Sequence, residues 1–136
     1  MGDYSNKQLI RMTLPSHDFG AGAEIYSFYL PPREDGKQSQ GQVANVGIMA
    51  ITEAFANDSG GGTVQVGTAT DNDAYAKLNI PDATADEACI DINTDTDAVI
   101  ADDIAAGTLV EVNCTQSTDT GTAAGIGMPF IDLYIW

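Results

Sequence analysis

Short apolar runs, in which every second side chain is hydrophobic, recur along the whole chain and are separated by glycine, proline, asparagine, aspartate and threonine. No stretch long enough for a stable helix has apolar residues at the i, i+3, i+4, i+7 spacing, so the pattern indicates strands. The runs that fit it are Lys7–Leu14, Glu24–Leu30, Gln42–Phe55, Thr63–Thr68, Ala74–Ile80, Ala88–Asn93, Thr108–Gln116 and Met128–Trp136. Eight short strands predict an all-β fold, a two-sheet antiparallel sandwich rather than a barrel with a ligand-sized lumen.

The last run, Met128–Trp136, shows most clearly how the two faces of a strand are expected to divide. Alternation places Ile131, Leu133 and Ile135 on one face, which we expect to pack into the core. The opposite face is unusually aromatic for open solvent and carries Phe130, Asp132, Tyr134 and Trp136.

The longest run, Gln42–Phe55, is partly apolar on both faces, so we expect a central strand or one that bends between the two sheets. Only Ile100–Ala106, with Asp102 and Asp103 near its start, is expected to form a helical turn.

At 136 residues, with 43% hydrophobic residues, the chain is expected to fold as one domain over residues 1–136 with a core that needs no metal or disulfide. Residues 1–20 could instead form an extended N-terminal arm. No apolar run approaches the roughly 20 residues that span a bilayer, and the first residues lack the pattern of a secretory signal. We therefore expect a soluble protein.

Charge is divided unevenly along the chain. Residues 1–37 hold four bases against five acids, a balance of -1, while residues 38–136 hold fifteen acids against Lys77 alone, a balance of -14. Phosphate backbones and anionic lipids are bound through Lys and Arg that this chain lacks, which argues against nucleic acid and membrane as partners.

Segment 61–80, Gly-Gly-Thr-Val-Gln-Val-Gly-Thr-Ala-Thr-Asp-Asn-Asp-Ala-Tyr-Ala-Lys-Leu-Asn-Ile, has a strand that ends in Val-Gly-Thr, an acidic turn and a Tyr-Ala-x-Leu strand. It is preceded by Val-Ala-Asn-Val-Gly-Ile at 43–48 and followed by Ile-Ala-Ala-Gly-Thr at 104–108, before a Leu-Val-x-Val strand. This order resembles the head decoration, or cement, proteins of tailed bacteriophages. The resemblance covers residues 40–136 and does not extend to the first 37 residues.

The resemblance implies a jelly-roll-like sandwich that assembles, often as a homotrimer, on the exterior of a virion capsid after synthesis in the cytoplasm of a bacterial host. Its expected partners are the major capsid protein and sister subunits, and it implies no catalysis and no cofactor. The role needs only a rigid body, a contact face and a solvated outer surface.

The near-neutral strands Lys7–Leu14 and Glu24–Leu30 offer apolar residues that could dock to the shell or to a sister subunit. The candidate interface residues are Leu9, Arg11, Met12, Tyr26, Phe28, Arg33, Tyr134 and Trp136. Alternatively, these side chains simply fill the core, as most apolar strand residues do.

A carbohydrate- or receptor-binding sandwich on a virion surface is the alternative function. Its stacking platforms would be drawn from the aromatic side chains Tyr26, Tyr29, Tyr75, Tyr134 and Trp136.

The remaining residue patterns give only weak indications of a catalytic site, a metal site or a disulfide. His17 lies in a loop next to Pro15, where its neighbours Ser16 and Asp18 give no triad geometry, so we expect it to have no role. The spacing Asp91, Asn93, Asp95, Asp97 and Asp102 is similar to a calcium loop but lacks its central glycine and final glutamate, so an acidic loop edge is the favoured interpretation. Alternation places Cys114 on the same face as the apolar residues of its run but Cys89 on the face opposite those of its own run, which favours two reduced thiols over a bridge.

Overall fold

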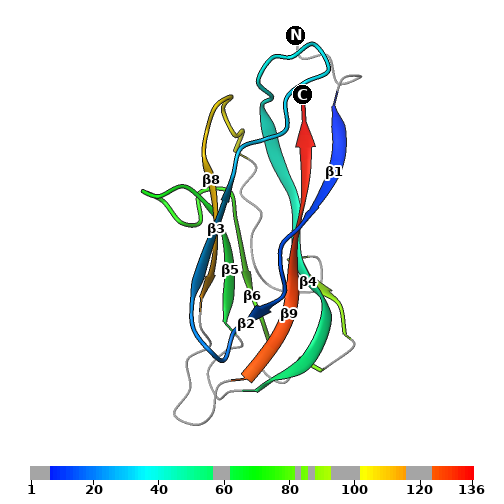
Figure 1. Cartoon of the computed structure of the whole chain (residues 1–136), viewed down its shortest axis with the longest axis vertical. Helices are drawn as coiled ribbons and strands as arrows, with labels where there is room; N and C mark the ends of the chain where they lie inside the picture. Colours follow the sequence, from blue (N-terminus) through cyan, green and yellow to red (C-terminus); the bar gives the residue numbers. More distant parts are fainter. Residues whose placement is uncertain (1–6, 57–61, 82–83, 86–87, 93–101, 116–123) are drawn as a thin grey trace.

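The structure is a computed structural model that describes residues 7–56, 62–81, 84–85, 88–92, 102–115 and 124–136. Two antiparallel sheets face each other and enclose the core, which confirms the all-β two-sheet sandwich (Figure 1). The first sheet has the order β1-β9-β4-β7, with β2 also paired to β9, and the second has the order β3-β8-β5-β6. The strands are β1 (Gln8–Thr13), β2 (His17–Asp18), β3 (Glu24–Phe28), β4 (Gly41–Ala56), β5 (Thr63–Gly67), β6 (Ala76–Asn79), β7 (Ile90–Asp91), β8 (Val110–Thr115) and β9 (Ala124–Ile135).

Strand β9 is the centre of the first sheet. It pairs with β4 on one side and with β1 and β2 on the other, so the segment from residue 8 to residue 19 runs antiparallel along it. Pro15 separates β1 from β2, but the amides of Leu14 and Phe19 still donate to the carbonyls of Pro129 and Gly125 at 2.9 and 2.8 Å. The described part of the N-terminal segment is thus part of the sheet.

Strand β4 is bent by irregularities in its pairing with β9, as expected for a long strand that is apolar on both faces. Its inward residues change parity along the strand: Val46 and Ile48 are buried in the core, but farther along Ile51 and Phe55 are. The change occurs at Ala50, which has a positive φ of 50° and lies where the register shifts between Met49 and Glu53. Between these paired positions β4 advances by four residues and β9 by only two, and beyond this irregularity the inward side chains are those of Ile51 and Phe55.

The core lies between the sheets and combines β-branched and leucine side chains with a few aromatic rings. Strand β9 supplies Ile131, Leu133 and Ile135 from the face predicted for it. Strand β8 supplies Val110, Val112 and Cys114 from alternate positions.

Three sequence-based expectations change. The segment around His17 is a short strand, because pairing with β9 resumes after Pro15. Ile104 is not in a helical turn: it is buried and forms an isolated antiparallel bridge with Gly41, with N···O distances of 3.0 and 2.6 Å. Strand β9 begins at Ala124, earlier than the sequence indicates, because Gly125 and Gly127 interrupt the apolar alternation there.

Candidate interaction surfaces

The candidate residues divide by strand parity between the core and the outer faces of the sheets. Leu9, Arg11 and Tyr134 lie on the outer face of the β1–β9 pair, and Trp136 is half-buried just beyond β9. Met12, Tyr26 and Phe28 are half-buried and pack against the core. Arg33 lies in the loop between β3 and β4. The sequence-based list therefore mixes docking candidates with core residues.

Cross-strand neighbours from β1 and β9 form a continuous band on the outer face of the first sheet. Leu9 is directly opposite Tyr134, and their side chains are 61% and 39% exposed. Next to this pair, two residues before Leu9 and two residues after Tyr134, the Lys7 ammonium lies 4.2 Å from the centre of a Trp136 ring. We call this band the β1–β9 strip; its members are Lys7, Leu9, Arg11, Asp132, Tyr134 and Trp136.

Arg11 and Asp132 form the end of the strip that lies nearest the middle of the sheet. Its Nε and Nη2 donate to the two carboxylate oxygens of Asp132 at 2.7 and 3.0 Å, a bidentate pair. These hydrogen bonds raise the pKa of Arg11, with smaller contributions from the charges of Asp132, Cys89 and Asp91. The guanidinium carbon also lies 4.2 Å from the centre of the Phe130 ring.

Phe130 is buried although it points away from the main core. Its register partner on β4 is Gly47, and a Cβ placed on that glycine would lie 2.3 Å from Phe130 Cζ and 2.5 Å from the Ile90 carbonyl oxygen. The ring thus lies against the bare backbone of Gly47 and under Arg11. This arrangement explains why an aromatic residue of the outer face is not a free docking group.

A second apolar surface lies on the outer face of the other sheet. Ile25 and Tyr29 are 56% and 64% exposed, and both have the outward parity of β3. Leu109, 40% exposed, precedes β8 and lies near Tyr29, because Phe28 pairs with Val110. Glu111 of β8 is opposite Ser27, between these apolar residues. We call Ile25, Tyr29, Leu109 and Glu111 the β3–β8 patch.

The patch could have been found only by choosing the correct parity of β3. The sequence predicts Tyr26 and Phe28 as interface candidates here and names Tyr29 only as a possible stacking platform, yet the outward residues are Ile25 and Tyr29. The Tyr26 hydroxyl donates to Glu24 at 3.1 Å, and burial followed by this hydrogen bond raises the pKa of Tyr26 to about 12.

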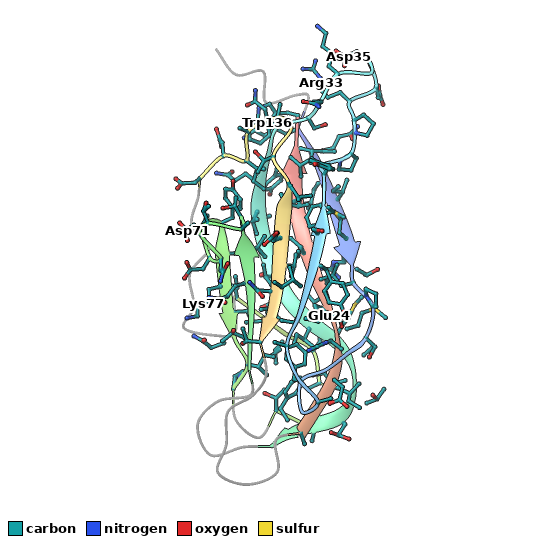
Figure 2. All side chains as sticks on the ribbon, turned by 60° about the vertical axis from the view of Figure 1, so that its left-hand side comes forward. Glu24, Arg33, Asp35, Asp71, Lys77 and Trp136 are labelled. Atoms are coloured by element: carbon teal, nitrogen blue, oxygen red, sulfur yellow. The ribbon has the colours of Figure 1, made fainter. Side chains whose placement is uncertain are left out.

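The loop between β3 and β4 carries Arg33 at the same end of the sandwich as Trp136 (Figure 2). Arg33 donates to Asp35 at 2.9 Å, and its own backbone amide donates to the Lys37 carbonyl at 2.8 Å. Gly36 takes the positive φ of 78° that this turn requires. Three of the five basic residues, Lys7, Arg33 and Lys37, are therefore near the end at which β1 begins and β9 ends.

His17 is buried at the crossover from the first sheet to the second. Its Nε2 hydrogen-bonds the Gly22 carbonyl at 3.0 Å, and its Nδ1 lies 3.8 Å from Glu24 Oε2. The ring also contacts Phe19 edge-on, with the centroids 4.6 Å apart. The arrangement is that of a histidine that joins two elements, a structural role that the expectation of an idle loop residue missed.

The calcium-like spacing falls largely outside the described residues, which include Asp91 and Asp102 but not Asn93, Asp95 or Asp97. Asp91 accepts a hydrogen bond from the side chain of Asn45 at 3.1 Å. In the described ranges, no group of three or more histidine, cysteine or acidic side chains could hold a metal ion.

The two cysteines are free thiols, as the alternation of the strands predicts. Cys89 is exposed, whereas Cys114 is buried on the core face of β8. Burial raises the pKa of Cys114 to about 12, with a smaller contribution from the charge of Glu24.

Within the described part of the chain, no helix is long and apolar enough to cross a membrane. No protein-family model, curated protein or solved structure matches the chain.

Proposed function

We propose that the chain is a structural subunit of a virion, which decorates and stabilises the outer surface of the capsid by binding the major capsid protein and sister subunits. The observation that carries this proposal is the position of its exposed apolar side chains. Leu9, Tyr29, Leu109 and Tyr134 lie on the outer faces of the two sheets, and Leu9 and Tyr134 lie next to the Lys7–Trp136 contact at the end of β9. Apolar surfaces held on paired strands are suited to adhesion, because docking them costs little backbone order.

The distribution of charge supports the same function. The bases Lys7 and Arg11 lie in the strip, whereas residues 38–136 carry a balance of -14. A subunit that binds through its near-neutral strands would turn its acidic surface outward, where like charge keeps particles apart. Standard interfaces bury about 1,600 Å² in total, and symmetry-related copies on a shell add avidity.

The alternative of a carbohydrate-binding module is less well supported by the placement of the aromatic residues. Tyr26 packs against the core and Tyr75 is buried, while Tyr29 and Tyr134 lie on opposite sheets. Lys7 already covers one face of the Trp136 ring. These residues do not form one open platform on which a sugar could stack.

Rebinding to shells tests the proposal. Capsids stripped of the chain are mixed with the purified protein and pelleted, and we expect the wild type to pellet with them and to raise the temperature at which they rupture. The double variant L9D/Y29D should bind about tenfold or more weakly, because each Asp places a charge on an apolar contact. K77E is the matched control, since it makes the same change of two negative charges on β6, outside the strip and the patch. Failure of the wild type to pellet, or its retention on an oligosaccharide array instead, would contradict the proposal.

A further inference from the structure

The two apolar surfaces differ in charge. The strip contains Lys7, Arg11 and Asp132, which sum to +1, and the patch contains Glu111, which gives -1. Each surface combines its charge with exposed apolar side chains: Leu9 and Tyr134 in the strip, and Ile25, Tyr29 and Leu109 in the patch.

We propose that the β1–β9 strip of one copy of the chain binds the β3–β8 patch of a second copy. The inference rests on the proposed function, because it assigns the surfaces through which sister subunits contact each other. Leu9 and Tyr134 would pack on the apolar residues of the patch, with the cations of the strip facing Glu111.

Electrostatics favours this pairing over pairing of like surfaces. Two copies with a net charge of -15 each repel one another, so a stable contact needs a place where the local charge opposes that repulsion. Strip against strip and patch against patch bring together surfaces of the same sign. Strip against patch is the combination that unites opposite signs.

The geometry makes the contact heterologous, because the strip and the patch lie on different sheets. A heterologous contact produces a closed ring when the rotation between subunits closes, and a filament when it does not.

The two surfaces lie at similar height along the sandwich. Leu30, which follows Tyr29, reaches to within 2.8 Å of a Cβ placed on Gly41, and Gly41 pairs with Ile135 next to Tyr134. Two copies joined by this contact would therefore stand side by side at equal height.

A mixing experiment tests this contact without any capsid. L9D damages only the strip and Y29D only the patch, so each variant alone should be monomeric by sedimentation equilibrium while the wild type associates. Each residue is more than half exposed, and circular dichroism and thermal unfolding should show both variants folded like the wild type. An equimolar mixture should form a species of two chains and nothing larger, because each pair has one intact strip and one intact patch to join. K77E, with its larger added negative charge, should associate like the wild type.

Charge reversal gives a second, independent test. K7E and E111K should each raise the dissociation constant about tenfold, and the double variant K7E/E111K should recover most of the loss. The proposal is overturned if the wild type stays monomeric up to about 1 mM, the weak limit of specific association. It is also overturned if Y29D alone still associates, or if the mixed variants stay monomeric. Association through these surfaces by a chain that does not bind shells would leave this inference standing and remove the proposed function.

Discussion

The Arg11 guanidinium lies 4.2 Å from the centre of the Phe130 ring, so a charged side chain covers an aromatic residue that the opposite sheet does not reach. Asp132 holds the guanidinium in place through two hydrogen bonds. The outer face of the first sheet therefore has a small packed centre of its own, next to the exposed pair Leu9 and Tyr134.

Replacing Phe130 with alanine should lower the free energy of unfolding by about 3 kcal/mol, because the side chain is 1% exposed and fills the space above Gly47. Urea denaturation followed by tryptophan fluorescence measures the change. R11K keeps the charge but loses the bidentate geometry, and it should lower the melting temperature by less than Phe130→Ala does. A loss below about 1 kcal/mol for Phe130→Ala would show that the ring is not packed as described.

Gly47→Ala should destabilise the protein by about 1–3 kcal/mol, because the new methyl group would overlap both the Phe130 ring and the Ile90 carbonyl oxygen. Thermal unfolding of the variant beside the wild type provides the measurement. Gly36→Asn is the control: nothing lies within 4 Å of a Cβ there, and asparagine tolerates the positive φ of that turn. Equal melting temperatures for Gly47→Ala and the wild type would contradict the close approach of the two strands.

The two thiols should differ in reactivity. At about pH 8, a thiol-specific reagent should label Cys89 at once and leave Cys114 unlabelled until the protein unfolds, because Cys114 is buried and its pKa is raised to about 12. Mass spectrometry of native and urea-unfolded samples counts the modified residues. Rapid labelling of both thiols in the native state would mean that β8 does not face the core as described.

Stability should fall at alkaline pH. Cys114 has a pKa of 9.0 when unperturbed and about 12 in the folded chain, so above about pH 9 the unfolded state releases a proton that the folded state keeps. The free energy of unfolding should then decrease by about 1 kcal/mol per pH unit from this one group. The raised pKa of Tyr26 adds a further decrease above its unperturbed value of 10.0.

Urea denaturation midpoints measured from pH 7 to pH 11 test the predicted loss of stability at alkaline pH. The stability of Cys114→Ala should start lower but stay level between about pH 9 and pH 10, where the wild type already declines. A wild-type stability that does not change between those values would contradict the burial of the thiol.

Much of the fold could be predicted from alternation because period-two patterns persist where strands are regular. Ile131, Leu133 and Ile135 face the core as predicted from Met128–Trp136. The pattern fails in β4, where Ala50 has a positive φ and the alternation of inward and outward side chains is interrupted. As a result Ile51 is buried and Ala50 is exposed. A local backbone irregularity of this kind leaves no signal in hydrophobicity alone.

The surfaces were harder to predict than the fold. In β1 and β3 both faces carry apolar side chains, so the sequence alone does not say which face meets the opposite sheet. The structure turns Leu9 outward and Met12 inward, and it turns Ile25 outward and Phe28 inward. Similarly, Pro15 correctly indicates a break before His17, but the pairing of His17 with Gly127 depends on a strand more than a hundred residues away.

Electron microscopy of the purified native particle tests the central claim most directly. The account predicts ordered copies of this sandwich on the capsid exterior, with the end that carries Trp136 and the two apolar surfaces in contact with the shell or with neighbouring copies. Purified capsids without the chain, or copies that expose Leu9, Tyr29 and Tyr134 to solvent, would contradict it.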